Sequence, residues 1–135
     1  MDEDLAKLQG EWTVVFLEVD GIAPAPSTFA GAKIVIDGDR FTSLGMGAVF
    51  EGNLAVNSTA SPKVLRMMFT AGPEKGNTNH GIYELDGDRL RLCLSVTGGP
   101  APTEFATSPG SGRALETLDR ANRAPSQPPP PIRLW

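Results

Sequence analysis

The chain has 135 residues, of which 40% are hydrophobic, so it is long enough to fold as one domain with a small core and too short for two. Its net charge of −4 and its pI near 4.9 argue against nucleic acid or a membrane surface as a partner, because both attract clustered basic residues. No run of Lys or Arg occurs anywhere in the chain.

One short helix is predicted at the start of the chain. Leu5 and Leu8 lie three residues apart among polar residues, with acidic residues at the N-terminal side, where the helix dipole favours them. This spacing predicts a helix within 2–9, which Gly10 ends.

Eight short strands are predicted after the helix. They are rich in β-branched and aromatic residues or alternate between apolar and polar ones, and Gly, Pro, Asn and Asp bound them. The Asp-Gly pairs within 37–39 and 86–88 supply the positive φ angles of tight hairpins. The last segment could be a strand or a short helix, and we favour the strand. The predicted strands are 11–19, 33–36, 40–44, 48–56, 63–71, 80–85, 89–96 and 113–120.

These elements predict an all-β fold. About eight strands joined mostly by hairpins between sequence neighbours build an antiparallel up-and-down meander, which removes its exposed edges by closing into a barrel. The barrel domain is expected to cover 1–120. The segment 121–135 is expected to be a proline-rich C-terminal tail, since its four consecutive prolines lack amide donors and favour polyproline II.

Several stretches resemble a known family. The stretch 8–12, Leu-Gln-Gly-Glu-Trp, contains the Gly-x-Trp pattern that opens the barrel of lipocalins. Over 8–120 the chain resembles a family of uncharacterised lipocalin-like bacterial domains that is abundant in planctomycetes. The resemblance implies the fold, and the family has no established activity to transfer. The other matching stretches are 37–41, 81–88 and 102–107.

The resemblance also implies how the barrel closes. In lipocalins the signature Trp packs at the closed end beneath an Arg from the last strand. Trp12 and Arg120 are the matching pair here, with Arg113 and Arg123 as alternatives to Arg120. A guanidinium over an indole face contributes about 0.5 to 2 kcal/mol, which orients a barrel end and is no catalytic device.

Strand alternation predicts which side chains face the interior. If Trp12 points inward, Val14 and Phe16 point inward with it, and the inner set of 89–96 includes Leu90, Leu92 and Leu94. A barrel of eight strands is just wide enough to be filled by its own side chains or to hold one small ligand, and both outcomes stay open.

Few polar groups could anchor a ligand or carry out chemistry. The candidate anchors are Tyr83, Arg91, Glu104 and Arg66, although such side chains are usually exposed. No hydrolase, phosphate-binding or dinucleotide-binding motif is present, so no catalytic residue is assigned and no cofactor is expected. His80 is the only histidine and lacks the partners of a metal site, so no metal is expected either.

The single cysteine and the acidic N-terminus indicate in which cellular compartment the chain is expected. Cys93 lies among leucines and is expected to be a buried, unreactive thiol, and one cysteine cannot form an internal disulfide. The first residues are acidic and no apolar run approaches the ~20 residues of a membrane span, so a cytoplasmic setting is expected for the chain as given.

Two predicted strands, 11–19 and 63–71, carry apolar residues on both faces. Something should therefore cover their outer sides. The candidates are the N-terminal helix, a second subunit in a homodimer, and the tail, whose Ile132, Leu134 and Trp135 would be costly to expose as a patch.

Three functions remain open. The first is a binding module that holds a small apolar molecule in the barrel. The second is a cofactor-independent barrel enzyme, of cyclase or isomerase type, that orients an apolar substrate. The third is a structural or protein-interaction domain with a packed core. A packed interior would exclude the first two, and a cavity with one charged group over an apolar floor would favour catalysis.

Overall fold

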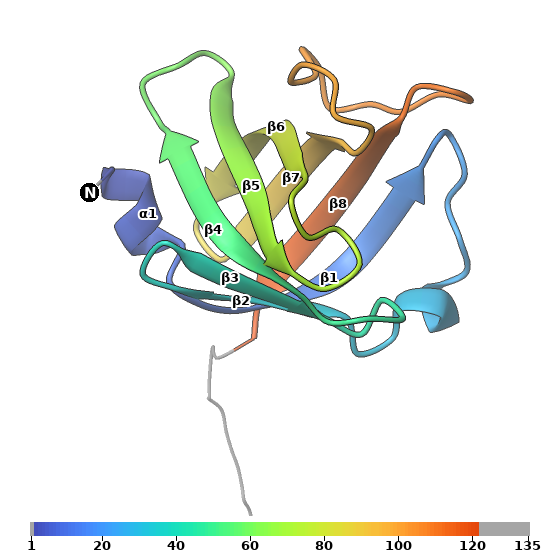
Figure 1. The fold of residues 1–135 in the computed structure, drawn as a ribbon, viewed down its shortest axis with the longest axis horizontal. Coiled ribbons are helices and arrows are strands. Elements are labelled where there is room, and N and C mark those ends of the chain that lie inside the picture. Colours follow the sequence, from blue (N-terminus) through green and yellow to red (C-terminus); the bar gives the residue numbers. More distant parts are fainter. Residues whose placement is uncertain (1, 122–135) are drawn as a thin grey trace, which may run out of the picture.

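Eight antiparallel strands close into a barrel in the computed structural model, which describes residues 2–121 (Figure 1). Each strand pairs with its neighbours in sequence, and the first pairs with the last. The all-β, up-and-down barrel predicted from the sequence is confirmed. Its elements are α1 Glu3–Lys7, β1 Gly10–Val19, the 3-10 helix η1 Pro26–Phe29, β2 Lys33–Asp37, β3 Arg40–Leu44, β4 Phe50–Asn57, β5 Lys63–Ala71, β6 Thr78–Asp86, β7 Arg89–Ser95 and β8 Arg113–Arg120.

Both Asp-Gly turns form tight hairpins as predicted. Gly38 and Gly87 have φ angles of 64° and 59°, which glycine adopts without steric cost. The strands that they join pair up to the turn itself, so the β2–β3 and β6–β7 ribbons have a fixed register. No helix among residues 2–121 has the length and apolarity needed to cross a bilayer.

Strand β1 contains a β-bulge that changes which side chains face inward. Trp12 and Val14 are buried as predicted, but the register with β8 shifts between Val14 and Phe16. Beyond this bulge the inward position passes to Leu17, and Phe16 is 39% exposed. The predicted inward position of Phe16 is therefore wrong, because strict alternation holds only where no extra residue interrupts the ladder.

The first and last strands close the barrel around Trp12. The indole is fully buried, its Nε1 donates to the carbonyl of Leu8 at 2.9 Å, and Arg120 pairs with Trp12 in the β1–β8 ladder. The guanidinium carbon of Arg120 lies 4.3 Å from the ring centroid, in the cation–π arrangement that the resemblance implies.

Arg120 also holds the end of α1 in place. Its Nη1 donates to the carbonyl of Gln9 at 2.9 Å and its Nη2 to the carbonyl of Lys7 at 2.8 Å, while its Nε donates to Asp88 at 2.9 Å. Carbonyl groups at the C-terminal end of a helix and just beyond it have no partner within the helix, and the two arms of the guanidinium group supply one to each. The C-terminal end of α1 is thus attached to the two strands that close the barrel.

A loop covers the outer wall of a different pair of strands than expected. Ile82 on β6 and Cys93 on β7 are almost completely buried, yet they lie outside the main core cluster. The loop 96–112 packs over β7, where the Cys93 Sγ lies 3.7 Å from the carbonyl oxygen of Ala106 and the Arg91 guanidinium lies 4.5 Å from the Phe105 ring centroid. Ile82 is the partner of Cys93 in the β6–β7 register. Burial raises the pKa of the Cys93 thiol, in line with an unreactive group.

The outer side of β1 remains exposed within the described chain. Val15 and Phe16 are each more than a third exposed, and α1 packs beside β4 instead (Figure 1). A homodimer through this side stays a prediction. The tail apart from Ala121, including Ile132, Leu134 and Trp135, lies outside the described residues.

Replacing Arg120 by Lys should lower the free energy of unfolding by about 1 to 3 kcal/mol. Lysine keeps the charge but cannot bond both carbonyls and stack on the indole at once. Urea denaturation followed by tryptophan fluorescence measures the change. Arg40→Lys is the matched control, because Arg40 is exposed and has no ion-pair partner among residues 2–121. Equal stabilities of the two variants would contradict this role for Arg120.

Candidate functional site

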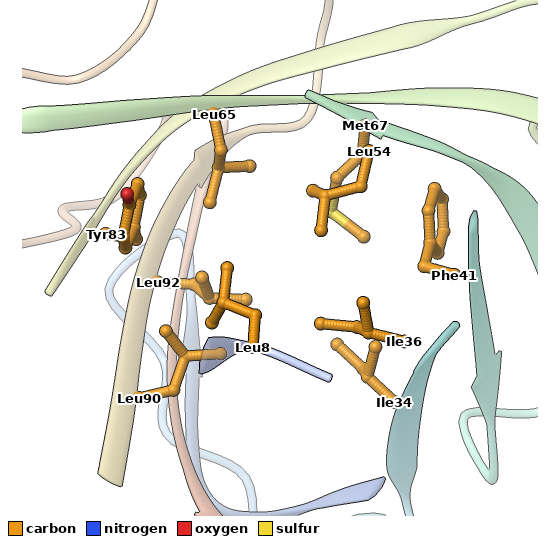
Figure 2. Close-up of a pocket in the computed structure, with 10 residues that line it drawn as sticks. All are labelled: Leu8, Ile34, Ile36, Phe41, Leu54, Leu65, Met67, Tyr83, Leu90 and Leu92. Carbon is orange, nitrogen blue, oxygen red and sulfur yellow. The ribbon is translucent and has the colours of Figure 1, made fainter. Parts of the chain in front are cut away.

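One half of the barrel interior is packed with apolar side chains. Ten residues from α1's end and from six strands converge there, and Figure 2 shows their side chains pointing toward a common centre. Only about 20 Å³ remains between them, and no polar atom lines that space. A water molecule would fit but would find no hydrogen-bond partner, so this half is a dry floor rather than a ligand site.

The other half of the interior contains a cavity of about 320 Å³. Along β7, Leu90 and Leu92 face the packed half, whereas Leu94 faces the cavity, so the two spaces follow one another along the barrel. Ile34 and Met67 line both spaces and therefore separate the floor from the cavity. The other apolar side chains around the cavity are Met46, Phe50, Phe69, Val96 and Ala114.

Three aromatic rings form part of the floor and wall. Phe69 meets Phe41 edge to face at 5.4 Å between centroids, and it meets Phe50 at 6.1 Å. Gly52 makes this possible, because it lies between Phe41 and Phe69 in the sheet register and a Cβ there would come within 2.8 Å of the Phe41 ring. A side chain at position 52 would push the rings apart.

Among the described residues that line the cavity, Glu116 is the one buried side chain that can carry a charge. Ala114, Glu116 and Leu118 face the interior from β8, and Glu116 is 9% exposed. Its carboxyl group has no hydrogen-bond or ion-pair partner among residues 2–121. Because burial penalises the charged form and no donor compensates for it, the pKa of Glu116 is raised to about 7.

The remaining polar groups around the cavity also offer oxygen atoms. Asn79 is buried on β6, Ser43 is half-buried on β3, and Glu74 lies at the rim, where it accepts a hydrogen bond from Asn77. No Lys, Arg or His is among the described residues that line the cavity. The cavity is therefore apolar with an acidic wall.

A second buried carboxylate, at the α1 end of the barrel, is fully paired. Asp4 is 3% exposed and accepts hydrogen bonds from Lys63 Nζ at 2.8 Å and from the Tyr83 hydroxyl at 2.9 Å. The Lys63 ammonium lowers the pKa of Asp4, and burial together with Asp4 raises the pKa of Tyr83. This network attaches α1 to β5 and β6.

The predicted site residues divide into two groups. Val14, Leu92 and Leu94 face the interior as expected, and the Tyr83 ring lines the packed floor with its hydroxyl engaged by Asp4. Among these, Leu94 alone lines the 320 Å³ cavity.

The other predicted anchors lie outside the barrel. Arg91 pairs with Glu84 at 3.0 Å on the outer face of β7, and Arg66 and Glu104 are exposed. These residues were candidate anchors for which an exposed position was favoured, and they are not ligand anchors in the cavity. Arg91 has the opposite parity to the inward leucines, and Glu104 belongs to the loop that covers the outer wall.

Sequence reasoning missed Glu116. The two leucines of the segment 113–120, Leu115 and Leu118, have opposite parity, so by themselves they assign no inward face. The pairing of Arg120 with Trp12 was the usable signal, since side chains two and four positions earlier on a strand share its face.

No protein-family model matches the chain, and no similar curated protein or solved structure was found. The site is therefore interpreted from its own geometry. No cluster of three or more His, Cys, Asp or Glu side chains within 2–121 could hold a metal ion.

Replacing Glu116 by Gln should change how stability depends on pH. The pKa of Glu116 rises from 4.5 in the unfolded chain to about 7 on folding. Its contribution to the free energy of unfolding is therefore favourable at low pH and is lost as pH rises through 7. Between about pH 4 and pH 8, the free energy of unfolding of the wild type should therefore fall by about 3 kcal/mol relative to that of Glu116→Gln.

Urea denaturation at a series of pH values measures this difference. Glu104→Gln is the control, because Glu104 is exposed and its replacement should leave the pH profile of the wild type unchanged. Parallel pH profiles for wild type and Glu116→Gln would show that Glu116 is solvated.

Proposed function

We propose that this protein is a lipocalin-like binding module that holds a small, largely apolar molecule in the cavity beside Glu116. The observation that carries the proposal is the division of the interior, in which a dry, packed floor supports an apolar cavity of about 320 Å³. The closed barrel and the Trp12–Arg120 pair support membership of the lipocalin-like bacterial family that the sequence resembles.

The size of the cavity limits the ligand. A volume of about 320 Å³ corresponds to about ten water molecules, and so to a ligand of about ten non-hydrogen atoms. Burying about 250 Å² of apolar ligand surface contributes about 6 kcal/mol before the ordering costs of binding. Apolar contacts alone therefore support weak binding, and tighter binding requires a polar contact.

Blocking the cavity should abolish binding of a neutral apolar probe. We expect 4-phenyl-1-butanol to bind the wild type with a dissociation constant of about 10 µM to 1 mM. In Ala114→Phe the added ring occupies the cavity, because Ala114 lines it from β8, and affinity should fall at least about tenfold. Isothermal titration calorimetry measures both constants.

Ala23→Phe is the matched control, because Ala23 is exposed in the loop between β1 and η1. It adds the same side chain far from the cavity lining and should bind like the wild type. Equal binding by all three proteins would place the probe elsewhere on the surface and would contradict the proposal.

A second candidate function is proton-transfer catalysis. It is favoured by one observation: the single buried charge of the cavity wall lies over an apolar floor, and the pKa of Glu116 is near 7. A carboxyl group with such a pKa is present in both protonation states at neutral pH, which suits a general acid or base. Glu116 would then remove a proton from an apolar substrate, or donate one, without a cofactor.

Ring opening of 5-nitrobenzisoxazole tests this second candidate. A base removes the C3 proton, the N–O bond breaks, and coloured 2-cyano-4-nitrophenolate forms. If Glu116 acts as a base, the rate should exceed that of acetate at equal concentration by about 100-fold or more and should rise with pH up to the pKa near 7.

Glu116→Gln should reduce that rate to the background, while Glu74→Gln at the rim should retain most of it. Equal rates in wild type and Glu116→Gln would rule out Glu116 as the base and would leave the binding proposal standing.

A further inference from the structure

Resting on the proposed binding function, we infer that the ligand carries a protonated amine that pairs with the Glu116 carboxylate. The rest of such a ligand would be apolar and would contact the apolar side chains that line the cavity. This inference names the chemical class of the ligand, which the cavity volume by itself leaves open.

The polar groups of the cavity select the sign of the ligand's charge. Glu116 and Glu74 are acceptors when ionised, Asn79 and Ser43 can both accept and donate hydrogen bonds, and no basic side chain is among the described lining residues. An anionic ligand such as a fatty acid would meet like charge without a counter-ion. A protonated amine has three donors and no acceptor, and so it matches this lining.

The isolation of Glu116 argues for a partner that is absent from the protein itself. Buried carboxylates are normally paired, as Asp4 is by Lys63 and Tyr83, whereas Glu116 is more than nine-tenths buried with no partner among residues 2–121. A cation that contacts a buried, unpaired carboxylate with good geometry offsets part of the cost of burying its charge. A metal ion would need further ligands, and the described residues gather no such cluster.

Pairing between Glu116 and an amine depends on whether the Glu116 carboxyl group is ionised. In the sheet register it lies between Leu17 on β1 and Leu92 on β7, neither of which is charged. Glu74 at the rim is the other titratable side chain among the described lining residues. An alkylamine stays protonated up to about pH 10, so its binding should follow the appearance of the Glu116 carboxylate.

Three probes of matched length test the inference: 4-phenylbutylamine, 4-phenyl-1-butanol and 4-phenylbutyrate. They share the apolar part and differ in a terminal cationic, neutral or anionic group. Calorimetric titration at several pH values should show the amine binding at least about tenfold more tightly than the alcohol at pH 8, because a charge-assisted contact is added. The carboxylate should bind more weakly than the alcohol.

The pH profile should identify the responsible group. Amine affinity should rise about tenfold per unit as pH approaches 7, the pKa of Glu116, and then level off, whereas alcohol affinity should not rise. In Glu116→Gln the amine should bind no more tightly than the alcohol and should lose its pH dependence, while continued binding of the alcohol should show that the cavity is intact. Glu104→Gln, which changes an exposed carboxyl group outside the cavity, should retain the preference for the amine.

The outcomes separate the inference from the function on which it rests. Binding of the alcohol with no preference for the amine at pH 8 would overturn the inference and leave the binding module intact. If the preference for the amine over the alcohol persists in Glu116→Gln but disappears in Glu74→Gln, the amine contacts Glu74 at the rim. That result would also overturn the inference. Failure of all three probes to bind would overturn the proposed function together with the inference.

Discussion

The contact between Trp12 and Arg120 is the interaction on which the rest of the barrel depends. It lies where the first and last strands meet, and it joins three elements: the indole of β1, the guanidinium of β8 and the carbonyls that end α1. A sheet edge left open would expose unpaired backbone donors and acceptors. By joining these elements at one point, Arg120 closes the sheet and fixes the helix whose following residue, Leu8, completes the packed floor.

Two buried carboxyl groups show how the same side-chain chemistry takes opposite roles at different places in the barrel. Asp4, beside Lys63 and Tyr83, has a lowered pKa and stays charged, so it stabilises the attachment of α1. Glu116 has no donor among residues 2–121 and has a raised pKa, so its charge destabilises the protein near neutral pH. Groups that weaken the folded state and line a cavity are concentrated at functional sites, because binding or catalysis can require them.

The interior also explains why the binding and enzyme hypotheses remain closely related. Both need the apolar floor, which excludes water from one side of the cavity, and both use Glu116. They differ only in whether the carboxyl group holds a ligand or exchanges a proton with it. The outer wall has a separate role, since loop 96–112 covers Cys93 there and contributes only its first residue, Val96, to the cavity lining.

The sequence by itself determined the number and order of the strands, both Asp-Gly hairpins and the Trp12–Arg120 closure, because these follow from local turn chemistry, strand periodicity and the family resemblance. Side chains that depend on neighbouring strands were harder to place. The β-bulge after Val14 turned Phe16 outward, and Arg91 and Glu104 proved to lie outside. Only the tertiary structure showed that Glu116 is buried without a partner in the described part of the chain and that the interior is half filled. Burial depends on how distant strands approach one another rather than on the pattern within any one of them.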